Sequence, residues 1–265
     1  MTEIDQNYVS SELLHFVGRG MNENDQFDLF IKILTEGWVT HPPHNPNKSG
    51  GIYINTDAAI STNDMYSPQI TCFADIPLHD ISLHMDKYSA IGMSFSKDFI
   101  ANAGGVPVHY IPTESSVTIS KNLPPEDILK IFNKHGGDSL SKQMSEVIPK
   151  SKHFNEMLQE FHELFQIFND MEKNQRTSRA VSKLSIRILG LQNFLERHIF
   201  SYFKFFDHRK SDNDPENYYF EREWRIIGNL NFEISEVKTV LFPRKFSSQF
   251  RNVFPYYEGQ VVFTD

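Results

Sequence analysis

The stretch FEREWRIIG at residues 220–228 decides how the chain is organised, because strand-like sequence returns there after a long helical segment. Neighbouring residues of a strand point to opposite faces of a sheet, so Glu221, Glu223 and Arg225 are expected to share one face. Two carboxylates on one face of a strand are costly unless they are used or neutralised. The stretch therefore predicts a sheet strand that also carries a candidate site.

Strand-like apolar runs lie on both sides of the helical segment, at residues 13–17, 70–74, 90–95, 106–111, 239–242 and 260–263. Helical spacing of apolar residues separates several of these runs, at residues 24–34, 77–88 and 96–102. A Pro-, Asn- and Gly-rich segment at residues 41–51 predicts a loop.

The helical segment runs from about residue 124 to about residue 206. Two apolar stripes, at residues 154–171 and 181–202, flank the polar residues 173–178, and this pattern predicts an antiparallel helical hairpin. Strands, a helical block and strands again predict one α+β domain over residues 1–265 with a helical insertion. Two domains are the alternative, but neither group of strands is expected to form a sheet alone.

The composition is that of a globular protein, with 39% apolar residues, 23 Phe and 10 Tyr. A net charge of −8 argues against a general nucleic-acid binder, although a local basic patch stays compatible with it. The single cysteine, Cys72, excludes an internal disulfide. No apolar run approaches the roughly 20 residues that span a bilayer, and no signal peptide is recognisable. We therefore expect a cytoplasmic protein without a membrane partner.

Several catalytic motifs are absent from the sequence. It contains no Walker A motif, no dinucleotide-binding glycine triplet, no nucleophile elbow and no zinc-protease helix. The histidine pair at 41 and 44 shares a loop, whereas His79 and His84 would diverge by about 140° on a helix. No metal site is expected from these histidines.

Two phrases resemble the ADP-ribosyltransferase fold of the poly(ADP-ribose) polymerase branch. They are LLHFVGR at 13–19, followed by a helix ending in ILTEGW at 33–38, and ITCFAD at 70–75, followed by a later tyrosine. The resemblance implies a split mixed or antiparallel sheet that holds NAD as a substrate. It implies that His15 binds a ribose hydroxyl and that the other NAD-binding residues are Arg19, Cys72, Phe73 and Tyr88. Two departures are the spacing from His15 to Arg19 and the cysteine where an aromatic residue is usual.

The pair of glutamates resembles the Glu-x-Glu pair of ADP-ribosyltransferases that modify arginine, and this resemblance implies a role for each. Glu223 would stabilise the oxocarbenium-like ribose as nicotinamide leaves, and Glu221 would help to activate the acceptor. The alternative is structural, with both carboxylates paired to Arg222, to Arg225 or to a neighbouring strand.

A closer resemblance links the chain to the AbiGi abortive-infection family. It rests on CFADIPL at 72–78, IGMSFSK at 91–97, PVHY at 107–110 and EREWR at 221–225, with His84 and Tyr88 between them. This likeness covers the first 110 or so residues and the late strand, and it implies anti-phage defence in a toxin–antitoxin arrangement.

Taken together, these resemblances imply an NAD-dependent ADP-ribosyltransferase toxin that modifies a protein or nucleic acid and has an antitoxin or chaperone partner. The alternatives are a catalytically inactive antitoxin or phage-sensing binding module, and a glycohydrolase that only destroys NAD.

The segment DHRKSDNDPENYY at 207–219 is charged and nearly free of apolar residues, so it is expected to be a mobile loop. In transferases of this kind, the loop that enters the glutamate strand commonly reads the acceptor. The target-binding candidates are therefore Arg209, Lys210, Tyr218 and Tyr219. A disordered connector is the alternative.

Overall fold

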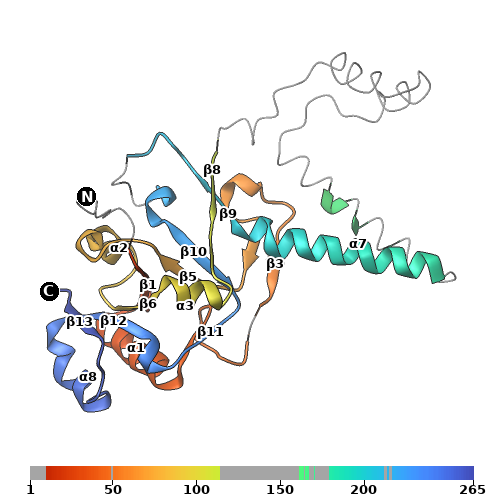
Figure 1. Cartoon of the computed structure of the whole chain (residues 1–265). Coiled ribbons are helices and arrows are strands. Elements are labelled where there is room, and N and C mark those ends of the chain that lie inside the picture. Colours follow the sequence, from red (N-terminus) through yellow and green to blue (C-terminus); the bar gives the residue numbers. More distant parts are fainter. Residues whose placement is uncertain are drawn as a thin grey trace, which may run out of the picture.

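The computed structural model describes residues 10–48, 50–113, 161–163, 165, 166, 170, 179–211, 214 and 217–265 (Figure 1). Within this part of the chain, a seven-stranded mixed sheet has the strand order β13-β12-β6-β1-β5-β10-β7. In chain order its strands are β1 (Glu12–Phe16), β5 (Ile70–Ala74), β6 (Gly92–Ser96), β7 (Val106–Pro107), β10 (Glu223–Ile227), β12 (Val237–Phe242) and β13 (Gln260–Phe263). Only β12 and β13 run parallel; the other neighbours are antiparallel.

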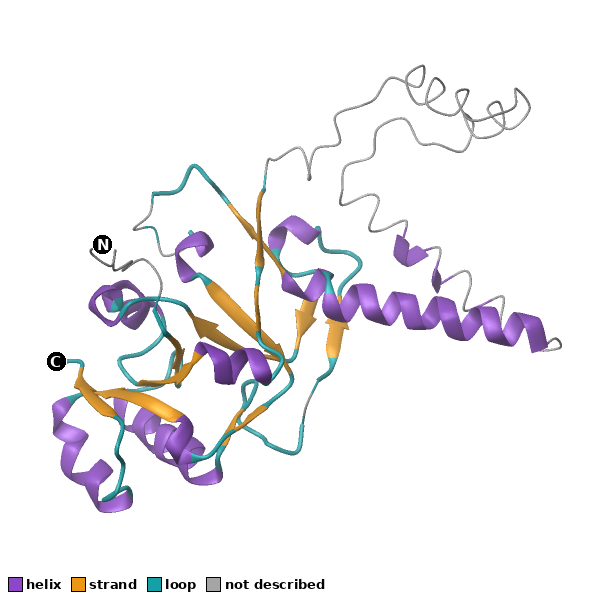
Figure 2. Cartoon of the chain, viewed as in Figure 1, coloured by secondary structure: helices purple, strands orange, loops and turns teal. Residues whose placement is uncertain are grey.

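Three strand pairs and several helices surround this sheet (Figure 2). The pairs are β2 (Trp38–Val39) with β11 (Leu230–Asn231), β3 (Ile52–Ile54) with β4 (Tyr66–Pro68), and β8 (His109–Pro112) with β9 (Phe203–Phe206). The α-helices are α1 (Glu23–Glu36), α2 (Ser82–Lys87), α3 (Lys97–Asn102), α7 (Arg179–His198) and α8 (Ser247–Val253). The 3-10 helices are Ile60–Thr62, Leu78–Asp80, Phe200–Tyr202, Tyr218–Glu221, Ile234–Glu236 and Arg244–Phe246.

Local signals set the bounds of helix α1. The Asn22 side chain accepts a hydrogen bond of 3.0 Å from the Asp25 backbone N–H, which satisfies one free donor of the first turn. Gly37 ends the helix in the left-handed conformation, with φ at 69°, and its N–H donates to the Ile33 carbonyl. The expected helix at residues 24–34 is therefore confirmed.

The main hydrophobic core lies between the sheet and the helices α1 and α8, which lie together beside β12 and β13 (Figure 1). Aromatic rings dominate this core. Phe27 stacks on Phe246 at 4.2 Å, and Phe242 packs against Phe250 at 5.0 Å. Burial of such large apolar side chains supplies most of the favourable free energy of folding.

The opposite face of the sheet carries a smaller cluster and the polar residues of the candidate site. Leu14, Ala74 and Ile81 are buried there beneath α2 and its preceding turn. On the neighbouring strands β5 and β10, Ala74 lies opposite Glu223 and Cys72 lies opposite Arg225. Residues two apart on a strand point to the same face, so Cys72, Glu223 and Arg225 lie on the same face as Ala74.

Strands β8 and β9 run parallel to each other outside the large sheet. Asn63 holds β9 in place, because its side chain both donates to and accepts from the Phe205 backbone, at 3.0 and 2.7 Å. Phe205 is buried against Met65 and Tyr66. Helix α7, which precedes β9, extends away from the sheet (Figure 1).

The expected α+β class with a large mixed sheet is confirmed. The strand at 203–206 corrects the expectation that the insertion is helical to its end. In the predicted hairpin, α7 and the turn Phe200–Tyr202 account for the second stripe. Most of the first stripe and all of the predicted turn at 173–178 lie outside the described residues.

Three predicted elements differ from the structure. The helix expected at 77–88 is broken, because the turn that starts at Pro77 is 3-10 and α-helical bonding begins only from Ile81. The strand expected at 106–111 divides at Pro107, which has no N–H to continue the ladder, into β7 and β8 of two different sheets. The strand expected at 220–228 begins only at Glu223, because Arg222 has a left-handed φ of 43°.

None of the described helices is both long enough and apolar enough to cross a membrane.

Phe242→Ala tests the aromatic core. Phe242 is fully buried and contacts rings from α1 and α8, so the cavity left by its removal should lower the free energy of unfolding by about 3–5 kcal/mol. Urea denaturation measures this value. Tyr53→Ala, at a side chain with 68% exposure, is the matched control and should change it by less than about 0.5 kcal/mol. A Phe242→Ala loss no larger than that of the control would contradict the described packing.

Candidate functional site

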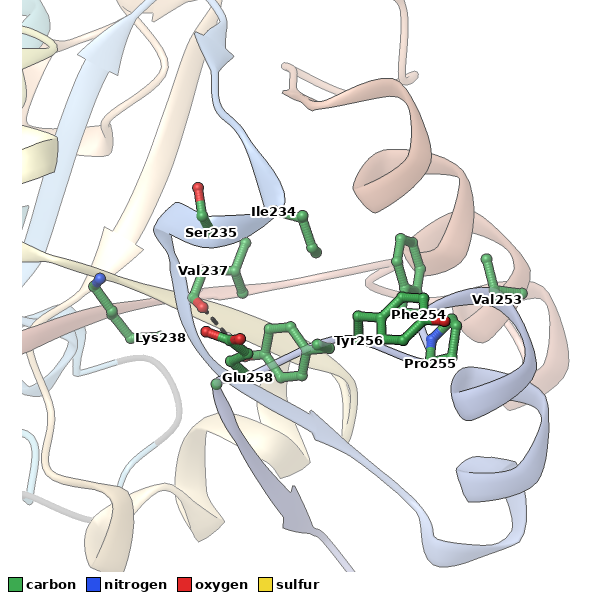
Figure 3. Close-up of a pocket in the computed structure, with 11 residues that line it drawn as sticks. Ile234, Ser235, Val237, Lys238, Val253, Phe254, Pro255, Tyr256 and Glu258 are labelled. Atoms are coloured by element: carbon green, nitrogen blue, oxygen red, sulfur yellow. Dashed lines mark hydrogen bonds between the residues drawn. The ribbon is translucent and has the colours of Figure 1, made fainter.

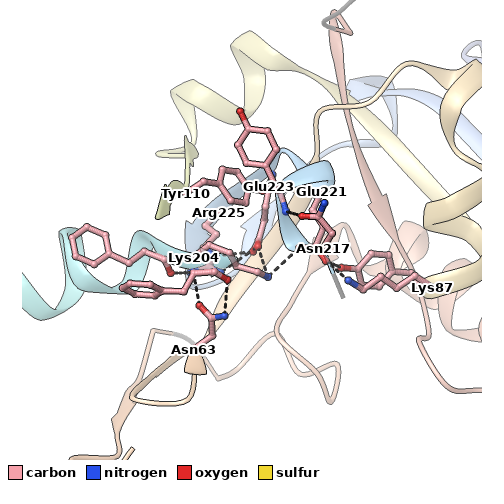
Figure 4. Close-up of polar contacts among 12 residues, drawn as sticks. Asn63, Lys87, Tyr110, Lys204, Asn217, Glu221, Glu223 and Arg225 are labelled. Atoms are coloured by element: carbon pink, nitrogen blue, oxygen red, sulfur yellow. Dashed lines mark hydrogen bonds and ion pairs between the residues drawn. The ribbon is translucent and has the colours of Figure 1, made fainter. Parts of the chain in front are cut away.

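Two buried glutamates share one lysine at the centre of the polar cluster (Figure 4). The Lys204 ammonium lies 3.0 Å from a Glu221 carboxylate oxygen and 2.9 Å from a Glu223 carboxylate oxygen. Lys87 binds the other Glu221 oxygen at 2.6 Å, and the Tyr88 hydroxyl donates to that same oxygen. The lysines thus neutralise carboxylates that would otherwise repel each other in a buried setting.

Two side chains of the β8–β9 pair contact Glu223. Tyr110 and Lys204 are register partners across these two strands. The Glu223 backbone N–H donates to the Tyr110 hydroxyl at 2.7 Å, while the Lys204 ammonium binds the Glu223 side chain. A strand pair outside the main sheet therefore fixes the first residue of β10.

Glu223 is engaged by donors on both of its carboxylate oxygens. Arg225 donates to one oxygen at 2.7 Å and to the other at 3.2 Å, and Lys204 donates to the second. The Cys72 thiol lies beside this carboxylate and contributes to lowering its pKa. Since a carboxylate offers about four lone-pair positions, these three charged hydrogen bonds occupy most of its acceptor capacity. Arg225 is held in turn by the Ser201 carbonyl, at 2.6 Å.

Charge balance keeps Glu221, Glu223 and Lys204 ionised. Burial alone would raise the pKa of Glu223, but Arg225 and Lys204 outweigh it and hold that pKa well below its ordinary value. Burial would also raise the pKa of Glu221, but the Lys204 ammonium outweighs it and the pKa is lowered. Burial would lower the pKa of Lys204, yet the two glutamates raise it. At neutral pH the glutamates are therefore carboxylates and neither is a proton donor.

The expected NAD-binding residues converge on one cavity of about 290 Å³. Its lining includes all five of them together with both glutamates: His15, Arg19, Cys72, Phe73, Tyr88, Glu221 and Glu223. They come from β1 and the turn after it, β5, the C-cap of α2, the 3-10 helix Tyr218–Glu221 and the start of β10. The structure thus brings together residues that the sequence separates by more than 200 positions.

Within this cavity, His15 and Arg19 have different surroundings. His15 Nδ1 lies 2.9 Å from the Cys72 carbonyl, and burial lowers the pKa of His15. Arg19 is exposed, and its guanidinium lies 5.2 Å from the centre of the Tyr88 ring. The Cys72 carbonyl thus fixes the orientation of the histidine ring.

Glu221 lies at the site but not on the strand. It ends the 3-10 helix Tyr218–Glu221, and Arg222 turns the chain before β10 begins. The expected alternation therefore applies to Glu223 and Arg225 but not to Glu221. The two carboxylates meet because they share Lys204 and not because of a two-residue strand period.

The expected target-binding residues occupy different places. The Tyr218 ring lies inside the cluster, 4.5 Å from the Lys87 ammonium and 4.6 Å from that of Lys204. Tyr219 is 55% exposed and stacks on Phe206 at 4.9 Å. Both tyrosines thus belong to a 3-10 helix, which corrects the expectation that the loop extends to residue 219.

The two basic candidates lie in the preceding segment. Arg209 is exposed and pairs with Asp207 at 2.9 Å, and the Lys210 backbone N–H donates to the Asp207 carbonyl. Residues 212, 213, 215 and 216 of the expected loop lie outside the described residues.

Sequence reasoning missed the two lysines and Tyr110 as site residues. Lys204 had a usable signal, because a single charge within the aromatic run FKFF at 203–206 indicates a buried, paired ammonium. Lys87 and Tyr110 had none, because their roles depend on contacts between distant segments. His84, which also lines the cavity, was not assigned a function.

Two other cavities lie elsewhere on the described part of the chain. One of about 1010 Å³ adjoins the site and shares Glu223 and His84 with it. The other, of about 500 Å³, lies near the C-terminus between Val237, Phe254 and Tyr256 (Figure 3). Among the described residues, no group of three His, Cys, Asp or Glu side chains could hold a metal ion.

Lys204→Met tests the shared ammonium. Loss of this charge leaves two buried carboxylates with less compensation, so the free energy of unfolding should fall by about 3 kcal/mol. Adding Glu221→Gln should restore part of that loss. Urea denaturation of the two single variants and the double variant measures the coupling energy between Lys204 and Glu221. Lys245→Met, at an exposed pair with Glu23, is the control and should cost less than about 1 kcal/mol. Additive losses in the double variant would contradict a shared ammonium.

His84→Phe tests the burial of a neutral histidine. Burial lowers the pKa of His84 from 6.5 to about 4, with Glu221 opposing and Lys87 reinforcing the shift. Between these pH values the unfolded chain binds more protons at this residue, so acidification destabilises the fold. Replacement by phenylalanine should remove roughly 2 kcal/mol of the stability lost between pH 7 and pH 4.5. Urea denaturation at the two pH values measures this difference. If the unmodified chain and His84→Phe lose the same stability between pH 7 and pH 4.5, His84 is solvated in the folded protein.

The sequence model of one protein family matches residues 54–252, about three quarters of the chain. The family is described as a proposed abortive phage resistance protein, AbiGi, antitoxin. The match spans the helical segment, which the expected resemblance did not cover, and it excludes His15 and Arg19. No curated protein and no solved structure matches the chain. The chain therefore belongs to the AbiGi family, which has a part in abortive phage resistance.

Proposed function

We propose that this protein is the antitoxin of an abortive-infection system, a binding component that does not turn over a substrate. The family description supports the antitoxin role. The single observation that carries the absence of turnover is the engaged state of Glu223, whose carboxylate accepts three charged hydrogen bonds from Arg225 and Lys204.

The physical reason concerns what a catalytic carboxylate must do. To stabilise a developing positive charge or accept a substrate hydroxyl, the carboxylate must present a free oxygen toward the reacting atoms. Here the negative charge of Glu223 is already compensated by Arg225 and Lys204, both of them largely buried. A substrate that needs the charge of Glu223 would compete with these charged hydrogen bonds, each of which is worth about 1.5–3 kcal/mol.

A second candidate function is an NAD-dependent ADP-ribosyltransferase or an NAD glycohydrolase. The observation that favours it is the convergence of all five expected NAD-binding residues and both glutamates on one cavity. At about 290 Å³, that cavity is at the small end of ligand sites and fits the nicotinamide–ribose end of NAD rather than the whole dinucleotide. His15, Phe73 and Tyr88 would hold that end, and bound NAD would supply the cleavable glycosidic bond.

In this second candidate, the acceptor would be a protein or nucleic acid read near the entrance to the site. Tyr219 is the best-placed candidate contact, because it is exposed beside the cluster. Arg209 and Lys210 would add positive charge in an acidic protein, and Tyr218 would act only indirectly because its ring faces the two lysines.

Expression of the chain alone in a bacterial host, with purified protein incubated with labelled NAD, tests the proposal. As an antitoxin without turnover, it should leave host growth unchanged, leave NAD intact and transfer no label to lysate macromolecules. Glu223→Gln and the control Glu258→Gln, at an exposed site outside the cluster, should behave like the unmodified chain.

Growth arrest with label on a macromolecule would overturn the proposal in favour of a transferase, and release of free ADP-ribose would favour a glycohydrolase. In either case Glu223→Gln should abolish the activity and Glu258→Gln should retain it.

A further inference from the structure

His84 is a buried histidine whose hydrogen-bonding capacity is unused. Its side chain lies on α2 with 2% exposure, and neither ring nitrogen has a hydrogen-bond partner among the residues that the structure describes. Buried polar side-chain atoms in native proteins almost always have a partner, because an unpaired one loses hydration without compensation. Two unpaired nitrogens on one ring therefore indicate a missing partner.

The ring is held rigidly by aromatic neighbours. Phe16 of β1 stacks on it with a centroid distance of 6.0 Å and an interplanar angle of 20°. Phe220 meets it edge-on at 4.9 Å and 84°. Because these contacts fix the ring, its nitrogens present hydrogen-bonding groups in constant directions, as a pre-organised recognition residue does.

His84 also lies where two cavities meet. It lines both the cavity of about 290 Å³ and the adjoining cavity of about 1010 Å³. Both cavities therefore border the His84 side chain, and because its two nitrogens are covered, a ligand bonds to them only by displacing a neighbouring side chain.

The hydrogen-bonding groups and charges that line the two cavities indicate which class of ligand fits them. Burial lowers the pKa of His84 to about 4, so at neutral pH the ring has one N–H donor and one bare nitrogen acceptor. The edge of a nucleobase, or a heteroaromatic amide, offers the complementary acceptor and donor. Arg19 lines the smaller cavity and, among the described residues, makes no ion pair. A guanidinium in this position suits a phosphate group.

We propose that the two cavities together bind one mononucleotide, whose base or amide hydrogen-bonds to His84 and whose phosphate pairs with Arg19. This inference rests on the proposed binding function and gives that function a ligand class. It assigns His84 to ligand recognition without any role in bond cleavage.

Isothermal titration calorimetry of the full chain with AMP, GMP, CMP, UMP and nicotinamide mononucleotide tests the inference. At least one of these should bind with a Kd below about 1 mM. His84→Phe keeps the ring and its packing but removes both nitrogens, so it should weaken that binding at least about tenfold while leaving the fold stable. His208→Phe, at an exposed histidine that lines neither cavity, should leave the Kd unchanged.

The phosphate contact has its own readout. The unmodified chain should bind the mononucleotide more tightly than the matching nucleoside, and Arg19→Gln should remove this preference without affecting nucleoside binding. In a protein labelled with ¹⁵N histidine, the His84 ring resonances should shift when the nucleotide binds, a measurement that needs no variant.

Binding by none of the five probes would overturn the inference, as would equal affinity of His84→Phe and the unmodified chain, or unmoved His84 resonances at saturation. Failure of this proposal is separable from failure of the proposed function, because growth and NAD consumption are measured independently of mononucleotide affinity.

Discussion

The site depends on one interaction, the Lys204 ammonium shared by Glu221 and Glu223. The lysine comes from β9, outside the large sheet; Glu223 begins β10 inside it, and Glu221 ends the 3-10 helix that precedes β10. Burying two carboxylates close together would be prohibitive without this charge. The arrangement therefore ties the chain that follows α7 to the sheet, and the positions of Tyr218 and Tyr110 are built around the same pair.

Short sequence patterns predicted the helices and strands whose form depends on neighbouring residues in the chain. The apolar spacing at residues 24–34 predicted α1, and the alternation of Glu223, Trp224 and Arg225 correctly separated the polar face of β10 from the core face. The same alternation failed at Glu221, because the positive φ of Arg222 breaks the strand and the sequence carries no sign of it.

Long-range pairing could not be predicted in this way. Strands β8 and β9 are parallel and separated by about ninety residues, so nothing in either segment indicates that Tyr110 faces Lys204. The convergence of His15, Tyr88 and Glu223 was expected only through resemblance to a known fold. Their common cavity confirms that these residues lie together, and the charged hydrogen bonds on Glu223 are the reason for our proposal of binding without turnover.

The most direct test of this account is a ¹³C NMR titration of the Glu221 and Glu223 carboxyl carbons in the folded protein. If Lys204 and its neighbouring cations hold both groups ionised, each carboxyl should titrate only below its ordinary pKa of 4.5 and neither should change between pH 5 and pH 8. A carboxyl that titrates near neutral pH would instead have the proton exchange of a general acid or base. That result would contradict an ammonium shared by two ionised carboxylates.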